Sequence, residues 1–408
     1  MHHPNSATTV VSLLFGLSFS AVAAFGCGDD TAGATASDGA SSGVDGGTAD
    51  AGTAGMATVG ASCEVTAAQW SAPDWSTTAA TALALRAQLD TLTGDATMRG
   101  AETGATSVEL SDLTAVWTAD PGLASVASPG FAPLAEAAMA EFVDVVDAGP
   151  RALLDDEGTW MPGEAGGVWG EDSRGINEGG IEVRQLVDKG GYSGGILYAY
   201  AIGLTEGSID AATIEAIAAA WGANAELDPD GELTDAANYA YQMGMFADMA
   251  TALTNAKALT EVPDCTGERD AALAEFFDLW ERSMAARLVF YGNRAEGKLL
   301  AATDDTGFAD VLHDLAEGLA LVAAFRGLPD PATGPLAGHG RTISDAQVDA
   351  AMAALGVELD DLGASTTGEL LQSLPQLESA VAGVEAVVME AYGVDAATIV
   401  GYAMPTPG

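Results

Sequence analysis

Apolar residues recur at helical spacing through almost the whole chain after Cys63. In the longest such segment, residues 266–301, Phe276, Leu279, Met284 and Leu288 repeat every three to five residues. Alternating runs rich in β-branched residues, which indicate strands, are few. Because the segments are joined by short connections, neighbouring helices are expected to be antiparallel. Residues 63–408 are therefore predicted to form an all-α domain, a single large helical bundle of antiparallel helices.

The same pattern predicts further helices and one long loop. Their approximate positions are residues 76–92, 132–146, 183–204, 209–221, 236–256, 308–325, 345–355 and 368–392. Ser344 and Gln347 have the spacing of a capping box before the helix at 345–355. Residues 149–180 form a loop that is long for a compact domain, which is typical of a functional segment. Its residues Trp160 and Trp169 are a candidate surface for partners.

The first 62 residues have the order of an export signal followed by a spacer. An apolar run over about residues 10–25 ends at Gly26 and Cys27. This favours a lipoprotein signal peptide over residues 1–26, with cleavage before Cys27 and acylation of its thiol. Residues 27–62 are mostly Gly, Ala, Ser, Thr and Asp and are expected to form a flexible, disordered tether. The protein is thus predicted to lie in the cell envelope, on the periplasmic or cell-surface side, anchored to the membrane through an N-terminal lipid.

An ordinary secretory signal is the alternative to a lipoprotein signal. Ala24 and Phe25 stand where lipoprotein signals usually carry Leu and a small residue, and no Lys or Arg precedes the apolar run. Cleavage after Ala24 would leave Cys27 as a free thiol. Because a lone thiol in an exported tail is open to oxidation, the lipoprotein signal is favoured.

The chain is strongly acidic. Its 14 Lys and Arg residues face 59 Asp and Glu residues, which gives a formal net charge of -45. Nucleic acid is excluded as a partner, because no basic surface is available to neutralise phosphates. The surplus carboxylates are able to attract metal cations. Adaptation to a salty medium explains the same charge and is the favoured explanation.

Cys27, Cys63 and Cys265 are the cysteines of the chain. If Cys27 is acylated, an even pair remains in an oxidising compartment, which predicts a disulfide between Cys63 and Cys265. This bond would tie the start of the domain to the segment before its longest helix. Two separate buried thiols are the alternative, because spacing alone does not fix connectivity.

A series of short motifs runs through the helical region. It comprises EVRQLVDKG at 182–190, the small-residue and aromatic segment 194–200, RDAA at 269–272, Trp280-Glu281, Tyr291 with Asn293, LHDLAEG at 312–318 and AYG at 391–393. In order and spacing these motifs resemble the bacterial exported lipoproteins known as domain of unknown function 4856. The resemblance implies an envelope-anchored helical domain of unassigned activity. It also implies a role in metal (iron) acquisition, because family members are often encoded near imelysin-like proteins and outer-membrane receptors.

One segment departs from that family. Relatives carry a His-rich, acidic stretch soon after the small-residue helix, whereas residues 208–241 contain no His. If that stretch holds a metal in relatives, this chain has lost the site or uses carboxylates there.

Gly191 to Gly195 match the G-x-S-x-G pattern of a hydrolase nucleophile elbow, with Ser193 as the nucleophile. That motif requires a preceding strand and a His base. The residues before it are predicted to be helical, so the small residues more plausibly allow neighbouring helices to approach closely. Five nearby tyrosines are interpreted as core residues and not as a ligand groove, namely Tyr192, Tyr198, Tyr200, Tyr239 and Tyr241.

His313 and Glu317 form a His–carboxylate pair one helical turn apart. The pair would ligate a metal ion, such as iron or zinc, if adjacent helices supplied further carboxylates. A hydrogen-bonded pair without a metal is the alternative, since two ligands do not make a site. His339 lies in a Gly-rich loop and is interpreted as solvated.

Asp228, Asp230 and Glu232 resemble the beginning of a calcium-binding loop. A complete EF-hand loop counted from Glu226 would need a closing Glu, and Ala237 stands there. A turn before a helix is the favoured interpretation, because Pro-Asp-Gly is itself a strong turn sequence.

No complete catalytic motif emerges, so a non-catalytic protein is favoured over an enzyme. The leading hypothesis is a membrane-tethered helical lipoprotein that assists in binding or acquiring a metal ion (iron, zinc or calcium). The alternatives are an imelysin-like peptidase or other hydrolase, and a non-catalytic module that holds envelope proteins or an outer-membrane receptor.

Overall fold

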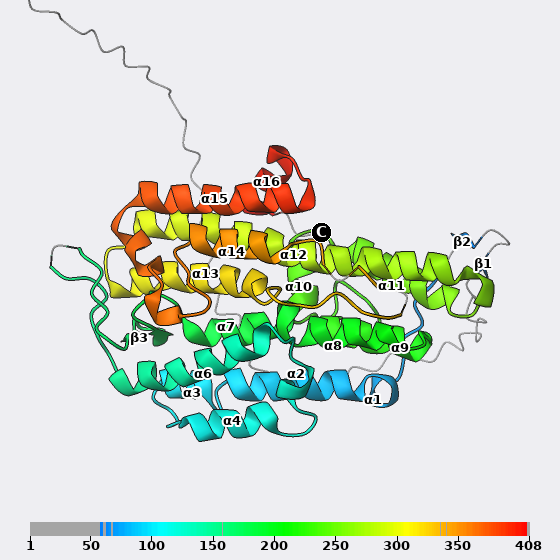
Figure 1. Ribbon diagram of the computed structural model, residues 1–408, viewed down its shortest axis with the longest axis horizontal. Helices are drawn as coiled ribbons and strands as arrows, with labels where there is room; N and C mark the ends of the chain where they lie inside the picture. The colour runs from blue at the N-terminus through cyan, green and yellow to red at the C-terminus, as the bar shows by residue number, and fades with distance from the viewer. Residues whose placement is uncertain are drawn as a thin grey trace, which may run out of the picture. The chain divides into compact units, whose positions relative to one another are not determined.

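Helices form where the apolar spacing predicts them, and the protein is all-α (Figure 1). The computed structural model describes residues 58–59, 63–66, 68–156, 158–334, 336–339 and 341–405. These residues belong to one compact unit that begins at Gly55. The predicted signal peptide, Cys27 and all of the predicted tether except residues 58–59 lie outside the described residues.

The helices of the described residues follow one another with few strands between them. In chain order they are α1 (Trp75–Thr78), α2 (Ala80–Thr93), α3 (Met98–Glu102), α4 (Leu110–Thr118), α5 (Leu123–Val126), α6 (Phe131–Ala148), α7 (Val183–Gly190), α8 (Leu197–Gly203), α9 (Ala211–Trp221), α10 (Asp235–Gln242), α11 (Phe246–Leu259), α12 (Thr266–Ala301), α13 (Asp305–Ala323), α14 (Asp345–Ala354), α15 (Leu374–Tyr392) and α16 (Ala396–Ala403). A five-residue π-turn, η1 (Gly191–Gly195), joins α7 to α8, and the backbone is kinked at Ser193, where φ is -84° and ψ is -115°. The predicted capping box is present at the start of α14. The side chains of Ser344 and Gln347 each accept a hydrogen bond from the backbone N–H of the other residue.

Two small antiparallel hairpins accompany the helices. β1 (Thr58–Val59) pairs with β2 (Val65–Thr66), and β3 (Gly167–Trp169) pairs with β4 (Arg174–Ile176). The first hairpin corrects the predicted boundary of the tether, because the backbone of Thr58–Val59 pairs with the segment after Cys63. The second hairpin lies in the segment predicted as a long loop and places Arg174 beside α13.

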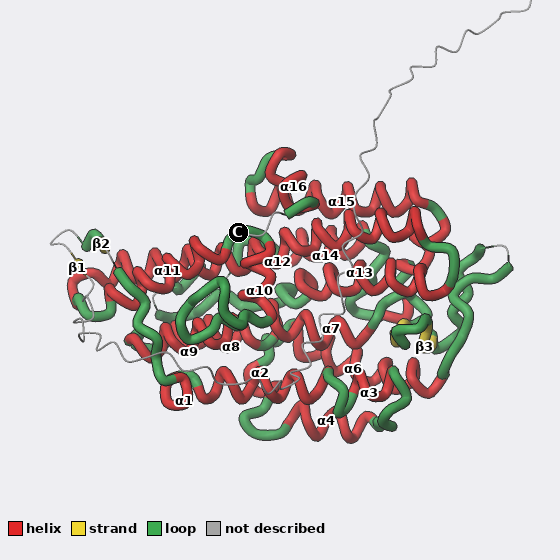
Figure 2. The backbone as a smooth tube through the Cα atoms, turned by 180° about the vertical axis from the view of Figure 1, so that it is seen from behind, coloured by secondary structure: helices red, strands yellow, loops and turns green. Residues whose placement is uncertain are grey.

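The long helices α12 and α13 form the centre of this unit. They are consecutive and pack against each other along most of α13 (Figure 1). α15 packs on α12, while α7 packs on α13 and is followed outward by α6. Figure 2 shows the same order from behind, with α15 and α16 at one side and α4 and α6 at the other. α7 is therefore the helix that brings its charged residues against α13.

Aromatic side chains fill the core near the middle of α12. Phe276, Phe277 and Trp280 of α12 are buried, and the Tyr198 ring of α8 meets Phe277 and Trp280 edge-on at 5.3 and 5.2 Å between centroids. Such edge-to-face pairs are a favoured aromatic geometry. Among the described residues, no helix combines the length and the apolar character that a membrane crossing requires.

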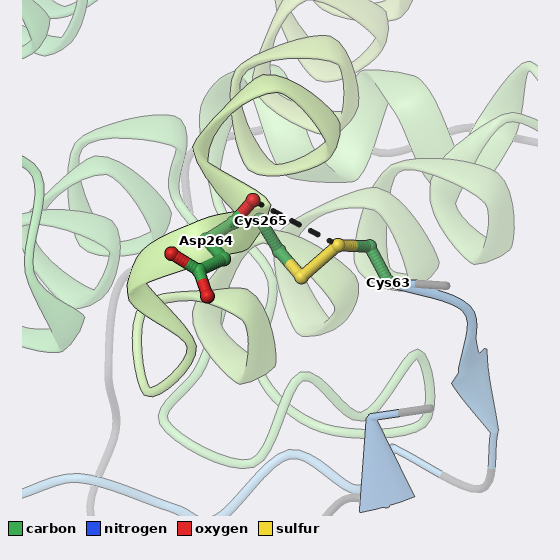
Figure 3. The surroundings of a disulfide bond; sticks show 3 residues. All are labelled: Cys63, Asp264 and Cys265. Carbon is green, nitrogen blue, oxygen red and sulfur yellow. Dashed lines mark hydrogen bonds between the residues drawn. A yellow bond between two sulfur atoms is a disulfide. The ribbon is translucent and has the colours of Figure 1, made fainter. Parts of the chain in front are cut away.

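Cys63 and Cys265 are joined by a disulfide, as the sequence predicts (Figure 3). Cys265 ends a short 3-10 turn immediately before α12, and the Cα atoms of the two cysteines are 5.5 Å apart. The Cys63 sulfur lies 4.0 Å from the carbonyl oxygen of Asp264. The bond closes a sequence separation of 202 residues and holds the start of the unit against its longest helix.

Candidate functional site

Helix α13 is buried on every face, including its charged one. Every residue from Ala309 to Ala324 except Asp310 is buried, and these include His313, Asp314 and Glu317. A buried charge is costly unless a partner compensates it. The neighbouring helices α7 and α12 supply those partners, so the face opposite the apolar stripe packs on protein instead of facing water.

His313 lies between two carboxylates. Its Nδ1 is 2.7 Å from Oε2 of Glu182, and its Nε2 is 3.5 Å from Oε2 of Glu317. Glu182 immediately precedes α7 and has no exposed surface. The imidazole ring is thus fixed on one side by Glu182 and presents its other nitrogen to Glu317.

Three further side chains surround the buried carboxylate of Glu182. Arg184 Nη2 lies 3.1 Å and Gln185 Nε2 lies 3.0 Å from Oε1, and Arg174 Nη1 lies 3.9 Å from Oε2. Burial by itself raises the pKa of Glu182, but His313, Arg174 and Arg184 outweigh it and hold the pKa well below its usual value. Glu182 is therefore an ionised carboxylate inside the protein.

Glu317 also faces cations. Lys189 Nζ is 3.6 Å from its Oε1, and Arg294 Nη2 is 3.7 Å from its Oε2. Burial raises the pKa of Glu317, yet His313, Lys189 and Arg294 lower it to about 2. The neighbouring Asp314 accepts from Arg294 Nε at 2.7 Å and from Lys298 Nζ at 2.9 Å, both on α12.

A second arm of the network reaches α3. The fully buried Glu102 accepts from Arg184 Nε at 2.9 Å and from Arg99 Nη1 at 3.2 Å. Burial raises the pKa of Glu102 despite these two cations. Arg184 therefore joins two buried carboxylates, Glu102 and Glu182.

Basic residues are concentrated in this network. Six of the 14 Lys and Arg residues of the chain make its ion pairs, namely Arg99, Arg174, Arg184, Lys189, Arg294 and Lys298. In so acidic a chain, this concentration marks the region between α7, α12 and α13 as the main electrostatic feature of the described residues.

The donor set fits a metal ion in part. Ligand atoms of His313, Asp314 and Glu317 lie within 4.8 Å of one another. A metal-bound His commonly donates its other ring N–H to a carboxylate, which is the position of Glu182. In addition, Oε1 of Gln185 is buried and has no hydrogen-bond partner among the described residues. Lys189 and Arg294 oppose metal binding, because both cations lie within 4 Å of Glu317.

Ser193 does not have the setting of a hydrolase nucleophile. It is fully buried in the π-turn η1, and its hydroxyl lies 3.3 Å from the carbonyl oxygen of Gly190. Helix α7, and not a strand, leads directly into this segment. A Cβ at Gly194 would lie 2.7 Å from the carbonyl oxygen of Ala324, so the small residues allow close helix approach, as predicted.

The remaining candidates lie away from this network. His339 is exposed in its loop. Asp228, Asp230 and Glu232 are exposed too, and the Asp228 carboxylate accepts from the backbone N–H of Asp230 at 3.0 Å, which is turn geometry. This geometry agrees with the favoured interpretation of a turn before a helix.

The aromatic candidates are part of the packing. Trp169 is buried, and the half-buried Trp160 donates its indole N–H to the carbonyl oxygen of Glu178 at 3.0 Å. The Trp169 indole is therefore not available to a partner, while the loop itself stays a predicted partner surface. The tyrosines belong to the core or pack against it, with three buried (Tyr192, Tyr198 and Tyr239) and two partly buried (Tyr200 and Tyr241).

Sequence reasoning found His313 and Glu317 but missed Glu182, Lys189 and Arg294 as their partners. The available signal was the mixture of acidic and basic residues in 182–189, because charges on a helix that is packed on both sides need partners of opposite charge on its neighbours.

No family model, curated protein or solved structure matches this chain.

Proposed function

We propose that this protein is an exported, lipid-anchored helical protein of the cell envelope that binds a divalent transition-metal ion at His313 and Glu317. In this proposal it acts as a non-catalytic accessory in metal acquisition, and it belongs to the family known as domain of unknown function 4856. The observation that carries the proposal is the position of His313, whose Nδ1 is held by buried Glu182 while Nε2 faces Glu317 at 3.5 Å.

The spacing of the two donors supports a shared ion. Zn–N and Zn–O bonds of about 2.0 to 2.2 Å place two ligands of one tetrahedral ion about 3.5 Å apart. Oε1 of Gln185 is a buried acceptor near this pair and has no partner among the described residues. His313 has to be neutral to offer Nε2, so metal binding competes with protons.

The surrounding cations define what kind of site this is. An incoming divalent ion meets Lys189 and Arg294 at Glu317, and these cations weaken its binding. A permanent structural ion is therefore disfavoured. An exchangeable ion suits a protein that takes up a metal and passes it on.

Metal analysis of the full-length chain, purified without a metal-affinity tag, tests the proposal. We expect Zn²⁺ or Fe²⁺ to bind with a stoichiometry of about one in calorimetric titration, since the donors form a single site. His313→Ala should abolish binding. His339→Ala removes an exposed loop imidazole and is the matched control, with binding unchanged.

Two results would contradict metal binding. One is a protein that holds no ion and shows no change of melting temperature with zinc, iron or calcium. The other is equal binding by the His313 and His339 variants, which would place the ion elsewhere.

The lipid anchor needs its own test. Cys27→Ala should move the protein from the membrane fraction to the soluble fraction and abolish labelling by a radioactive fatty acid. Unchanged membrane association of this variant would contradict the anchor.

A further inference from the structure

A groove lies between α12, α15 and α16, away from His313. It has a volume of about 700 Å³, within the range of small-molecule sites. Most of its lining is apolar and comes from Phe290, Met389, Ile399, Val400, Ala403 and Met404. Val400 is 55 % and Met404 is 72 % exposed, although both are apolar.

The polar part of the groove consists of Asn293, Arg294 and Glu385. Asn293 Nδ2 donates to Oε1 of Glu385 at 3.0 Å, which fixes that carboxylate beside α12. Arg294 directs Nε and Nη2 at Asp314. Among the described residues, the hydrogen bonds of Arg294 use Nε and Nη2, and that of Glu385 uses Oε1, so Nη1 and Oε2 make no hydrogen bond there. The Arg294 guanidinium also lies 4.9 Å from the centroid of the Tyr291 ring.

The groove therefore offers one remaining N–H donor of Arg294, whose charge is shared with Asp314 and Glu317, and one carboxylate oxygen of Glu385. Arg294 and Glu385 both line it but form no ion pair with each other among the described residues. A purely anionic amphiphile would meet the Glu385 carboxylate, and a purely cationic one would meet the Arg294 guanidinium. A ligand with adjacent positive and negative groups satisfies both.

We propose that this groove binds a zwitterionic α-amino acid with a large apolar side chain. Its carboxylate accepts from Nη1 of Arg294, its ammonium donates to Oε2 of Glu385, and its side chain lies on the apolar wall around Met389 and Ile399. This inference does not rest on metal binding, although the groove and the His313 network have Arg294 in common.

Calorimetric titration of the full-length chain with L-phenylalanine and L-leucine tests this inference. We expect saturable binding in the millimolar range or tighter. N-acetyl-L-phenylalanine lacks the ammonium and L-phenylalaninamide lacks the carboxylate, so each should bind about tenfold more weakly or worse, as expected for loss of one charged hydrogen bond. Glycine lacks the apolar side chain and should not bind measurably.

Variants localise the site. Glu385→Gln keeps an acceptor for Asn293 but removes the charge, and it should weaken L-phenylalanine binding about tenfold. Glu378→Gln, on an exposed position of the same helix, is the matched control and should bind as the wild type does. Ala403→Phe fills the groove and should abolish binding while the melting temperature confirms a folded protein.

Several outcomes would overturn the inference. Absence of saturable binding by both amino acids is one, and equal binding of the two blocked analogues is another. Unchanged binding by the Glu385 and Ala403 variants would place the ligand elsewhere. If sedimentation showed a dimer that Val400→Asp dissociates, the groove would be an interface between two copies instead.

Discussion

His313 Nδ1 lies 2.7 Å from Oε2 of Glu182, although the two residues are 131 positions apart in the chain. This contact joins α13 to the start of α7 and orients the imidazole toward Glu317. Because Glu182 has no exposed surface, the contact belongs to the interior and depends on the packing of both helices.

Glu182→Gln should destabilise the protein. The substitution leaves Arg184 and Arg174 without their shared carboxylate inside the fold, and removal of one member of a buried ionic network costs about 3 kcal/mol. Denaturant unfolding followed by circular dichroism measures the loss. Glu164→Gln, at an exposed position, is the control and should change the free energy of unfolding by less than about 0.5 kcal/mol. Equal stability of the two variants would contradict the role given to Glu182.

Glu281 should make stability depend on pH near neutrality. Its carboxylate accepts from the backbone N–H groups of Thr342 and Ile343 and from the Tyr392 hydroxyl, but burial raises its pKa from 4.5 to about 7. Between pH 4.5 and pH 7, the Glu281 carboxyl group is therefore protonated more fully in the folded protein than in the unfolded chain. Its contribution to the free energy of unfolding is full below about pH 4.5 and is lost as the pH rises to 7, by at most about 3 kcal/mol.

Glu281→Gln should remove this dependence. The difference in unfolding free energy between wild type and variant, measured from pH 5 to pH 8, should shift in favour of the variant as the pH rises. Glu275→Gln, exposed on the same helix, should leave the wild-type slope intact. A constant difference for Glu281→Gln across this range would disprove the expectation.

Gly194→Ala should lower the melting temperature. The added Cβ would lie 2.7 Å from the carbonyl oxygen and 2.8 Å from the carbonyl carbon of Ala324, so backbone has to move. Overpacking of this kind costs about 1 to 3 kcal/mol. Gly203→Ala, in α8 with nothing within 4 Å of its added Cβ, should be neutral or slightly stabilising. Thermal unfolding of the two variants side by side separates the steric effect from helix propensity.

Loss of the disulfide should destabilise the unit by about 2 to 5 kcal/mol, because a cross-link over a long loop restricts the unfolded chain. Its 202-residue separation places it among the long loops. The double substitution Cys63→Ser and Cys265→Ser should unfold at lower denaturant than wild type, and reductant should bring the wild type to the same value. Cys27→Ser is the control, and a response of that variant equal to the double variant would contradict the pairing.

The fold could be predicted from the sequence because the apolar periodicity is local. The helix at 266–301 and the capping box at Ser344 follow from residues a few positions apart, and the structure contains both. The disulfide could be predicted because only Cys63 and Cys265 remain once Cys27 is assigned to acylation. The kinked π-turn at Gly191–Gly195 and the pairing of Thr58–Val59 with Val65–Thr66 were missed, because neither segment carries a periodic apolar pattern.

The site could be predicted only in part. His313 and Glu317 share one helix face, so their spacing indicated a pair. Glu182 lies immediately before α7 and Arg294 lies on α12, and no local pattern indicates which carboxylate meets which cation. The long segment 149–180, with Trp160 and Trp169, was predicted as a candidate partner surface. Trp169 is buried, however, and the Trp160 indole donates a hydrogen bond to the carbonyl oxygen of Glu178.

The pairing of so many basic residues with carboxylates around α7, α12 and α13 has a consequence for the surface of the protein. Six of the 14 Lys and Arg residues pair with carboxylates of this network, so few are left to balance the remaining acidic residues of the 59 at the surface. Two such molecules therefore repel each other strongly at low ionic strength. Higher salt screens this repulsion and allows the molecules to approach more closely.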